Sequence, residues 1–206
     1  MANTGLDLET FREADSREIP GLTYIRDYIN ADEQKQLIDS IDNEEWSIDS
    51  AESQRRIQQH GYRLNYKNGV LVASTYIGSL PDWADSIGRK LASDRLMATV
   101  PDQVTVNEYL PGQGVMSHVD CVNCFGNTII TLSLGSPCVM DFTHDQAQEK
   151  ASILLMPGSI LAIKGAARYR WQHGVAAREV DRYEGREIVR TRRVAVTFRE
   201  ASFPYK

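Results

Sequence analysis

The chain has 206 residues, 42% of them hydrophobic, and its formal net charge at pH 7 is -5. A chain of this length can bury one sizeable core, so we expect a single domain over residues 1–206. The acidic balance excludes a protein that binds nucleic acid through bulk positive charge, because phosphate neutralisation dominates such binding. A nucleic-acid partner would need a local basic patch.

The lack of an expected targeting signal and the number of cysteines indicate the cellular compartment. No apolar run approaches the roughly 18 residues that span a bilayer, and the N-terminus is too polar and acidic for a signal peptide. The three cysteines, Cys121, Cys124 and Cys138, do not make a disulfide framework, which agrees with a reducing compartment. We expect a cytoplasmic protein that contacts no membrane, and a monomer.

The first half of the chain predicts two packing helices. Residues 1–20 read as a loosely ordered leader, and Leu22 to Ile29 as an edge strand. One helix begins after Asn30 or Asp32, and the other runs from Pro81 to Leu96. Each carries apolar side chains at helical spacing: Leu37, Ile38 and Ile41 on the first, Trp83, Ile87 and Leu91 on the second.

A segment between the helices, residues 50–69, breaks the acidic pattern. It interleaves cations with aromatic rings: Arg55, Arg56, Arg63 and Lys67 with His60, Tyr62 and Tyr66. Such a mixture suits a phosphate backbone with unstacked bases. The alternative is a solvated hairpin whose aromatic rings lie on the body of the protein.

After Pro101 short β-rich runs alternate with turns such as Pro111-Gly112 and Pro157-Gly158, the pattern of an antiparallel sandwich or barrel. We expect strands at Gln103 to Leu110, Thr128 to Leu134, Cys138 to Phe142, Ser152 to Met156, Ile160 to Ile163, Arg170 to Val175 and Arg193 to Glu200. Helices followed by strands predict an α+β, mainly β fold in which a β-sandwich is buttressed on one face by the helices.

His118 and Asp120 are two residues apart, so on an extended strand both side chains would project from one face. With His173 from a distant strand they would form two His and one carboxylate, the facial triad of non-haem Fe(II). A His-x-Asp pair alone is weak, and His173 could equally be a core histidine held by a backbone carbonyl.

On the last expected strand, alternate residues point to opposite faces, and Arg193 and Arg199 lie on the same face. Two guanidinium groups on one face could bracket a small dicarboxylate. The alternative is an edge strand with solvated arginines. By the same parity Asn107 and Tyr109 share a face and offer an amide and a phenol to a carboxylate.

Four other candidate ligands are set aside. Cys121 and Cys124 are spaced for zinc binding or redox cycling, but a structural zinc site usually needs a second such pair. We expect His60 and His144 to be ordinary loop residues.

Taken in order, Asn107-x-Tyr109, His118-x-Asp120, the distant His173 and Arg193-x5-Arg199 resemble the AlkB family of Fe(II)- and 2-oxoglutarate-dependent dioxygenases over about residues 100 to 200. The resemblance implies a double-stranded β-helix, or jelly roll, over residues 101–206. It implies iron bound by the two His and the Asp, and 2-oxoglutarate bound by the Asn, the Tyr and both Arg. Ala195 departs from the bacterial repair enzymes, which carry an Asn there.

The resemblance also implies a reaction: oxygen oxidises 2-oxoglutarate to succinate and carbon dioxide while a C–H bond is hydroxylated. If that carbon is attached to a base nitrogen, formaldehyde is lost and the net result is demethylation. The expected substrate is methylated single-stranded DNA or RNA, tRNA included, in DNA repair or RNA modification.

The substrate would be held under a lid within residues 21–100, formed by residues 53–69. In this lid Arg55, Arg56 and Arg63 would contact phosphates, and Tyr62 or Tyr66 would lie near the base. The segments 106–114 and 133–135, together with Gly61-Tyr62, also look like the subgroup related to a tRNA wobble-uridine hydroxylase. The alternatives are hydroxylation of a wobble base or a protein side chain, and a non-catalytic cupin-like protein that binds metal or a small acid.

Overall fold

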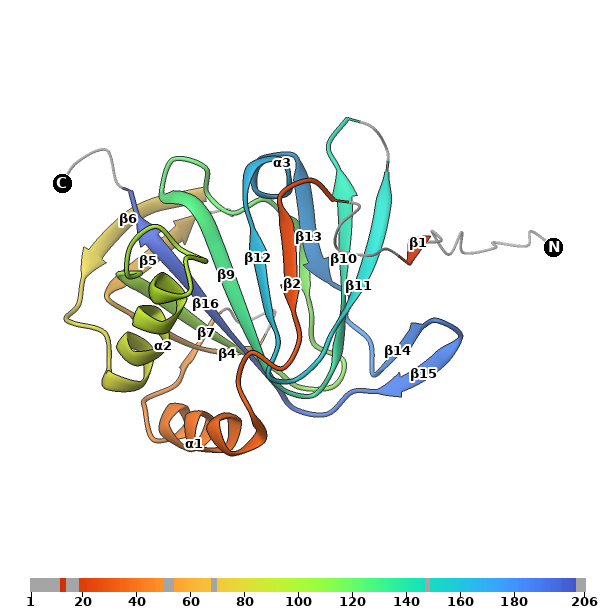
Figure 1. Cartoon of the computed structure of the whole chain (residues 1–206), viewed down its shortest axis with the longest axis horizontal. Coiled ribbons are helices and arrows are strands. Elements are labelled where there is room, and N and C mark those ends of the chain that lie inside the picture. Colours follow the sequence, from red (N-terminus) through yellow and green to blue (C-terminus); the bar gives the residue numbers. More distant parts are fainter. Residues whose placement is uncertain (1–11, 14–18, 50–53, 68–69, 147–148, 203–206) are drawn as a thin grey trace.

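Two β-sheets form the body of the protein in the computed structural model, which describes residues 12–13, 19–49, 54–67, 70–146 and 149–202 (Figure 1). The first sheet has five strands in the order β1 (Arg12–Glu13), β11 (Lys150–Leu155), β10 (Cys138–His144), β13 (Trp171–Val175) and β8 (Val115–His118). The second has seven, in the order β2 (Leu22–Ile25), β12 (Ile160–Ile163), β9 (Phe125–Gly135), β16 (Arg193–Ala201), β7 (Gln103–Tyr109), β4 (Arg56–His60) and β3 (Ser47–Ile48).

The inner faces of the two sheets share one hydrophobic core. Phe125 and Ile129 of β9 belong to the same buried cluster as Phe142 of β10, Ile153 of β11 and Trp171 of β13. Strand alternation produces this, because every second residue of each strand points between the sheets. The other residues of the seven-stranded sheet are left to face outward.

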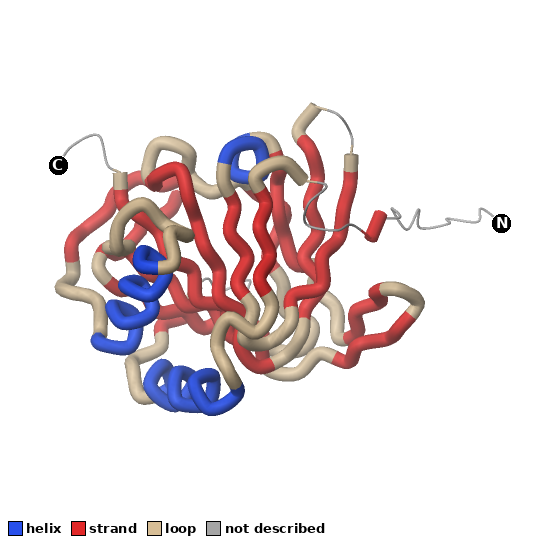
Figure 2. The backbone as a smooth tube through the Cα atoms, viewed as in Figure 1, coloured by secondary structure: helices blue, strands red, loops and turns tan. Residues whose placement is uncertain are grey.

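The helices α1 (Ala31–Asp42) and α2 (Asp82–Ser93) lie on that outer face (Figure 2). Leu37 and Leu91 of these helices share a second buried cluster with Val106, Val196 and Phe198 of the sheet. A capping box at Asn30 starts α1. A third, short helix, α3 (Gly165–Tyr169), precedes β13.

Two hairpins stand apart from the sheets. One joins β5 (Tyr62–Lys67) to β6 (Val70–Tyr76), and the other joins β14 (Val180–Tyr183) to β15 (Arg186–Val189). The second projects from the body in Figure 1. No helix in the described ranges is long and apolar enough to cross a membrane.

The seven strands expected after Pro101 are all present, and β2 lies at a sheet edge as predicted. The alternative of an edge strand for the two site arginines is excluded, because β16 is central and pairs with β9 and β7. One expectation is wrong. His60 and His144 close strands β4 and β10 instead of lying in loops. Most of the expected leader, residues 1–20, lies outside the described ranges.

Candidate active site

The sheet pairing of β8 with β13 brings two histidines together. His118 lies directly opposite His173, and the register then shifts, so that Val115 is the next residue paired, with Val175. A bulge of this kind re-aims side chains: Val115 and His118, three residues apart, face the same side. Asp120 lies beyond the end of β8 and reaches the histidines from a loop, whereas strand alternation had been expected to place it.

The ligand atoms of His118, Asp120 and His173 all lie within 4.8 Å of one another. His173 Nε2 is 3.5 Å from Asp120 Oδ2. The Nδ1 of His118 lies 2.9 Å from the Met116 carbonyl oxygen, to which Nδ1–H donates a hydrogen bond, so that in the neutral imidazole the free lone pair is on Nε2. Three acceptor atoms therefore converge on one point.

The protonation states suit a cation. Burial lowers the pKa of His173 to about 4, although the nearby Asp120 carboxylate acts against that shift. Burial alone would raise the pKa of Asp120, but the Arg199 guanidinium and the two imidazoles hold it well below its usual range. At neutral pH His173 is a neutral ligand and Asp120 an anion. Two imidazoles and one carboxylate are the donor set of non-haem Fe(II).

Two buried arginines hold Asp120. Arg199 Nη2 donates to Asp120 Oδ1 at 2.9 Å, which leaves Oδ2 facing His173. Arg168, from α3, is 1% exposed and donates to the backbone carbonyls of Asp120 and Cys121, each at 2.8 Å. We did not foresee Arg168 from the sequence, because no spacing relates it to the His-x-Asp pair.

Arg193 and Arg199 lie at opposite ends of one polar row on the inner face of β16. Arg193 is 2% exposed and donates to Ser133 Oγ at 3.1 Å. Arg199 donates to Gln103 Oε1 and Thr105 Oγ1, both at 3.1 Å. Burial of both guanidinium groups between strands contradicts the solvated-edge alternative.

The row continues onto the neighbouring strand β7. Arg193 pairs with Tyr109 and Ala195 with Asn107, so the amide and the phenol face the same side as the arginines. Gln103 and Thr105, which no sequence motif indicated, share this parity and complete the row at the metal end. Arg199 therefore lies beside the metal ligands, and Arg193 lies at the far end of the row.

The residues expected to bind substrate do not form one patch. Arg55 Nη1 donates to the Tyr109 hydroxyl at 3.1 Å, so its guanidinium points into the row just described. Arg56 points to the opposite face, where its Nε and Nη2 donate to the Glu108 carboxylate, both at 2.6 Å. Its guanidinium lies 4.8 Å from the centre of the Trp46 ring. Arg56 is therefore occupied by an internal ion pair.

The β5–β6 hairpin carries the remaining expected residues. The Tyr62 and Tyr76 rings meet at 5.5 Å with an interplanar angle of 63°, and Arg63 is exposed. Of Tyr66 only the backbone in β5 is described, and residues 50–53 and 68–69 of the expected lid lie outside the described ranges.

Side-chain bonds fasten this hairpin to the metal end of the row. The Leu64 backbone exchanges hydrogen bonds with the side-chain amide of Gln59. Gln59 pairs with Thr105, which accepts a hydrogen bond from Arg199, the partner of Asp120. The hairpin and the metal ligands are thus joined by one chain of contacts.

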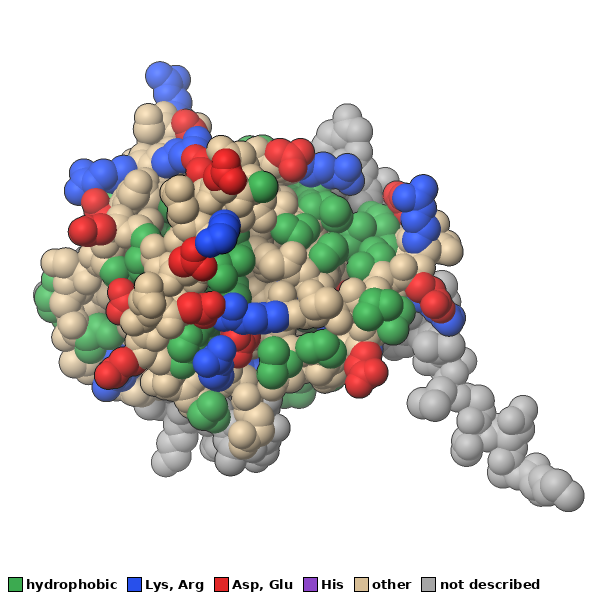
Figure 3. Space-filling view, turned by 90° about the horizontal axis from the view of Figure 1, so that it is seen from below, with side chains coloured by type: hydrophobic (Ala, Val, Ile, Leu, Met, Phe, Trp, Pro, Cys, Tyr) green, Lys and Arg blue, Asp and Glu red, His purple; other side chains and the backbone are tan. Residues whose placement is uncertain are grey.

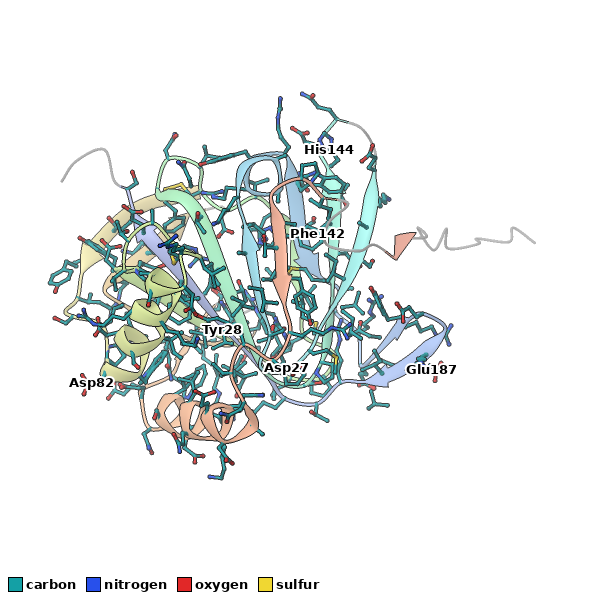
Figure 4. The ribbon with its side chains drawn as sticks, in the orientation of Figure 1. Asp27, Tyr28, Asp82, Phe142, His144 and Glu187 are labelled. Atoms are coloured by element: carbon teal, nitrogen blue, oxygen red, sulfur yellow. A yellow bond between two sulfur atoms is a disulfide. The ribbon has the colours of Figure 1, made fainter. Side chains whose placement is uncertain are left out.

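The cysteines and His144 are not among the metal ligands. Cys121 and Cys124 form a disulfide in the loop after Asp120, where we had expected none; Cys138 is free and buried. His144 and Phe142 lie along β10 (Figure 4), and the His144 ring packs edge-on against Trp171 at 5.1 Å. His144 Nδ1 accepts a hydrogen bond from the Gln146 amide at 3.1 Å, so it has a structural partner.

Comparison with known proteins agrees with this geometry. The family model "2OG-Fe(II) oxygenase superfamily" matches residues 21–199. The chain is 35% identical over 193 residues to the uncharacterized protein L905 of Acanthamoeba polyphaga mimivirus, covering 92% of this chain and 89% of that one. It is 36% identical over 174 residues to the Macaca fascicularis tRNA (carboxymethyluridine(34)-5-O)-methyltransferase ALKBH8, covering 82% of this chain but only 26% of that protein.

A solved structure supports the fold. The structure titled "The structure of OsALKBH1" superposes with a TM-score of 0.61 at 16% identity, covering 88% of this chain and 98% of that one. The non-catalytic alternative is set aside, and the prediction of an Fe(II)- and 2-oxoglutarate-dependent enzyme is confirmed. The chain belongs to the 2OG-Fe(II) oxygenase superfamily, as an AlkB-family dioxygenase near the ALKBH8 subgroup.

Proposed function

We propose that this dioxygenase oxidises an alkylated base of a nucleic acid, either by leaving a hydroxyl group on the base or by removing a methyl group as formaldehyde. The observation that supports this proposal is the chain of contacts between the β5–β6 hairpin and the Asp120 end of the site. The hairpin carries Arg63 and the pair of aromatic rings. A base held by that hairpin would lie next to the metal ligands. The match to a tRNA-modifying relative supports the same substrate class.

In this proposal the residues at the two ends of the row have different roles. Fe(II) held by His118, Asp120 and His173 supplies the activation of oxygen that is coupled to the oxidation of 2-oxoglutarate. Arg199 keeps Asp120 ionised and fixes which oxygen faces the metal site. At the far end Arg193 binds the second carboxylate of 2-oxoglutarate through charge-assisted hydrogen bonds.

Asn107 and Tyr109 complete the cosubstrate site in this proposal. Both side chains face the row that runs between the two arginines. An amide and a phenol can each donate a hydrogen bond to a carboxylate. Ala195, opposite Asn107, adds none.

In this proposal the β5–β6 hairpin contacts the substrate. Figure 3 shows the face seen from below in Figure 1, where basic, acidic and apolar side chains are interspersed. With Arg55 and Arg56 both directed to internal partners, Arg63 is the cation of the expected set that is exposed on the hairpin. We infer few phosphate contacts and a large share of base stacking on Tyr62 and Tyr76, worth about 1–3 kcal/mol per base.

A wobble base of tRNA is the second candidate, and the 36% identity to the tRNA methyltransferase favours it. That protein is about four times as long as the matched region, so its whole activity does not transfer to this chain. The anticodon loop presents unstacked bases, which is what an iron site at the end of a barrel requires.

The experiment is a product screen in the presence of Fe(II), 2-oxoglutarate and oxygen. Methylated single-stranded oligonucleotides, tRNA and methylated peptides are each incubated with the enzyme, and mass spectrometry follows succinate and an added oxygen atom or a lost methyl group. Oxidised oligonucleotide supports the first candidate and oxidised tRNA the second. Oxidised peptide alone would overturn both.

Arg63→Ala with Tyr62→Ala tests the hairpin, with Arg182→Ala on the exposed tip of β14–β15 as the control. The loss of one phosphate contact should lower the salt dependence of single-strand binding by about 0.7 in logarithmic slope. Equal binding by the hairpin and control variants would remove the hairpin from the substrate site.

A further inference from the structure

Arg55 is directed at the cosubstrate end of the site by strand register. β4 pairs with β7 so that Ile57 lies opposite Asn107, and the same antiparallel register places Arg55 opposite Tyr109. On the other side of β7, Tyr109 pairs with Arg193. Arg55, which directly precedes β4, therefore lies level with Tyr109 of β7 and Arg193 of β16.

The side chains confirm this placement. The guanidinium carbons of Arg55 and Arg193 lie 5.3 and 5.4 Å from the centre of the Tyr109 ring. The Arg55 side chain is 11% exposed, and its second nitrogen binds the Asp49 carboxylate. Because the largely buried Arg55 guanidinium binds the Asp49 carboxylate and the Tyr109 hydroxyl, it is not available to a phosphate backbone.

We infer that Arg55 is a positioning residue of the cosubstrate site, which acts through the hydroxyl group of Tyr109. This inference rests on the proposed role of Tyr109 in binding 2-oxoglutarate. Arg55 has only donors, so the Tyr109 oxygen must accept its hydrogen bond. The phenol proton is then left to donate to another acceptor. The cation also polarises the phenol and strengthens the bond that it donates.

The acceptor that this geometry suits is the second carboxylate of 2-oxoglutarate. Arg199 marks the metal end of the row through Asp120, and Arg193 lies six residues along the same strand, roughly 20 Å of extended backbone. Tyr109 pairs with Arg193, at the end away from the metal ligands. Ala195, opposite Asn107, contributes no hydrogen bond to this row.

The test is a double-mutant cycle on 2-oxoglutarate binding, measured by calorimetric titration of the Mn(II)-loaded protein without oxygen. The variants are Arg55→Met, Tyr109→Phe and the combination, with Arg182→Met as a matched surface control. Arg55→Met removes the donor but keeps the length of the side chain. We expect about tenfold weaker binding for Arg55→Met, the size of one charge-assisted hydrogen bond.

The combined variant should bind no more weakly than Tyr109→Phe alone, because Arg55 acts through the phenol. Affinity for 2-oxopentanoate, which lacks the second carboxylate, should be the same for Arg55→Met and the parent. Additive losses, or an equal loss of affinity for both acids, would overturn the positioning role.

The two assignments fail separately. If Tyr109→Phe alone binds 2-oxoglutarate as the parent does, the proposed cosubstrate role of Tyr109 falls. If Tyr109→Phe weakens binding and Arg55→Met does not, only the inference on Arg55 falls. Circular dichroism of each variant distinguishes loss of binding from loss of folding.

Discussion

Gly174 follows the metal ligand His173, and its lack of a side chain is what allows β8 to approach β13. A Cβ built on Gly174 would lie 2.9 Å from the Ser117 backbone N and Cα and 3.0 Å from the Val115 carbonyl oxygen. Its backbone is not in the left-handed region, so alanine is excluded by contact alone and not by conformation. Gly174→Ala should therefore push apart the two strands that carry the histidine ligands.

The size of the effect follows from the distances. Ordinary contacts begin near 3.4 Å, so the Ser117 backbone must retreat by about 0.5 Å. Metal–ligand distances tolerate only about 0.2 Å, and His118 is the next residue after Ser117. We expect metal affinity to fall by about 10–100-fold, as for other losses of ligand orientation, and stability by about 1–3 kcal/mol from overpacking.

The assay is Mn(II) titration together with urea unfolding, and the control is Gly126→Ala on β9. A Cβ on Gly126 would meet the side chain of Glu200 at 3.2–3.3 Å, which can move aside. The control should therefore retain both metal affinity and stability. Wild-type Mn(II) affinity in Gly174→Ala would refute the claim that this glycine sets the ligand geometry.

Three further predictions concern the ligands and the buried charges. His173→Ala should abolish succinate formation from 2-oxoglutarate, since two ligands do not hold the metal in place; normal turnover would exclude the triad. Arg193→Lys should raise the apparent KM for 2-oxoglutarate about tenfold or more, because an ammonium lacks the planar fork, and an unchanged KM would speak against a bidentate contact. Asp181 is fully buried, and although burial raises its pKa, hydrogen bonds from Arg190 and the Val139 amide hold that pKa below its usual value. Asp181→Ala should cost about 3–5 kcal/mol at pH 7. The parent should lose this contribution as pH falls below about 4, where the unfolded carboxyl group takes up its proton; a urea midpoint that stays constant through that range would contradict the linkage.

The sequence predicted the parts of the fold that depend on long alternating strands. The parity of Arg193 and Arg199 places both on the inner face of β16, and the structure shows the same parity on β7. The short strand β8 was missed, because its four residues carry no clear alternation and its bulge breaks the period of two. Asp120 was expected to share an extended strand with His118, although it lies in a loop beyond the end of β8.

The segment expected to bind substrate, residues 53–69, shows a different limit of prediction from sequence. Arg55 and Arg56 were both interpreted as phosphate contacts, because composition records a cation without recording the face on which it lies. Once β4 is known to be a strand of the large sheet, adjacent residues must point to opposite sides. Arg168 could not be found at all from the sequence, since its partners are backbone carbonyls 47 and 48 residues away.

Because side chains alternate along β4 and β7, residues that face the active site and residues that stabilise the fold lie on opposite faces of one sheet. Arg55 and Tyr109 face the inner row, whereas their neighbours Arg56 and Glu108 face the helices. Glu108 is 3% exposed and is also bound by Arg192, which in turn reaches Asp42 at the end of α1. Because this outer ion network joins the sheet to α1 and lies on the sheet face opposite the inner row, a substitution of Arg56 should act on the free energy of unfolding. A substitution of Arg55, the residue directly before that strand, should act on the affinity for 2-oxoglutarate.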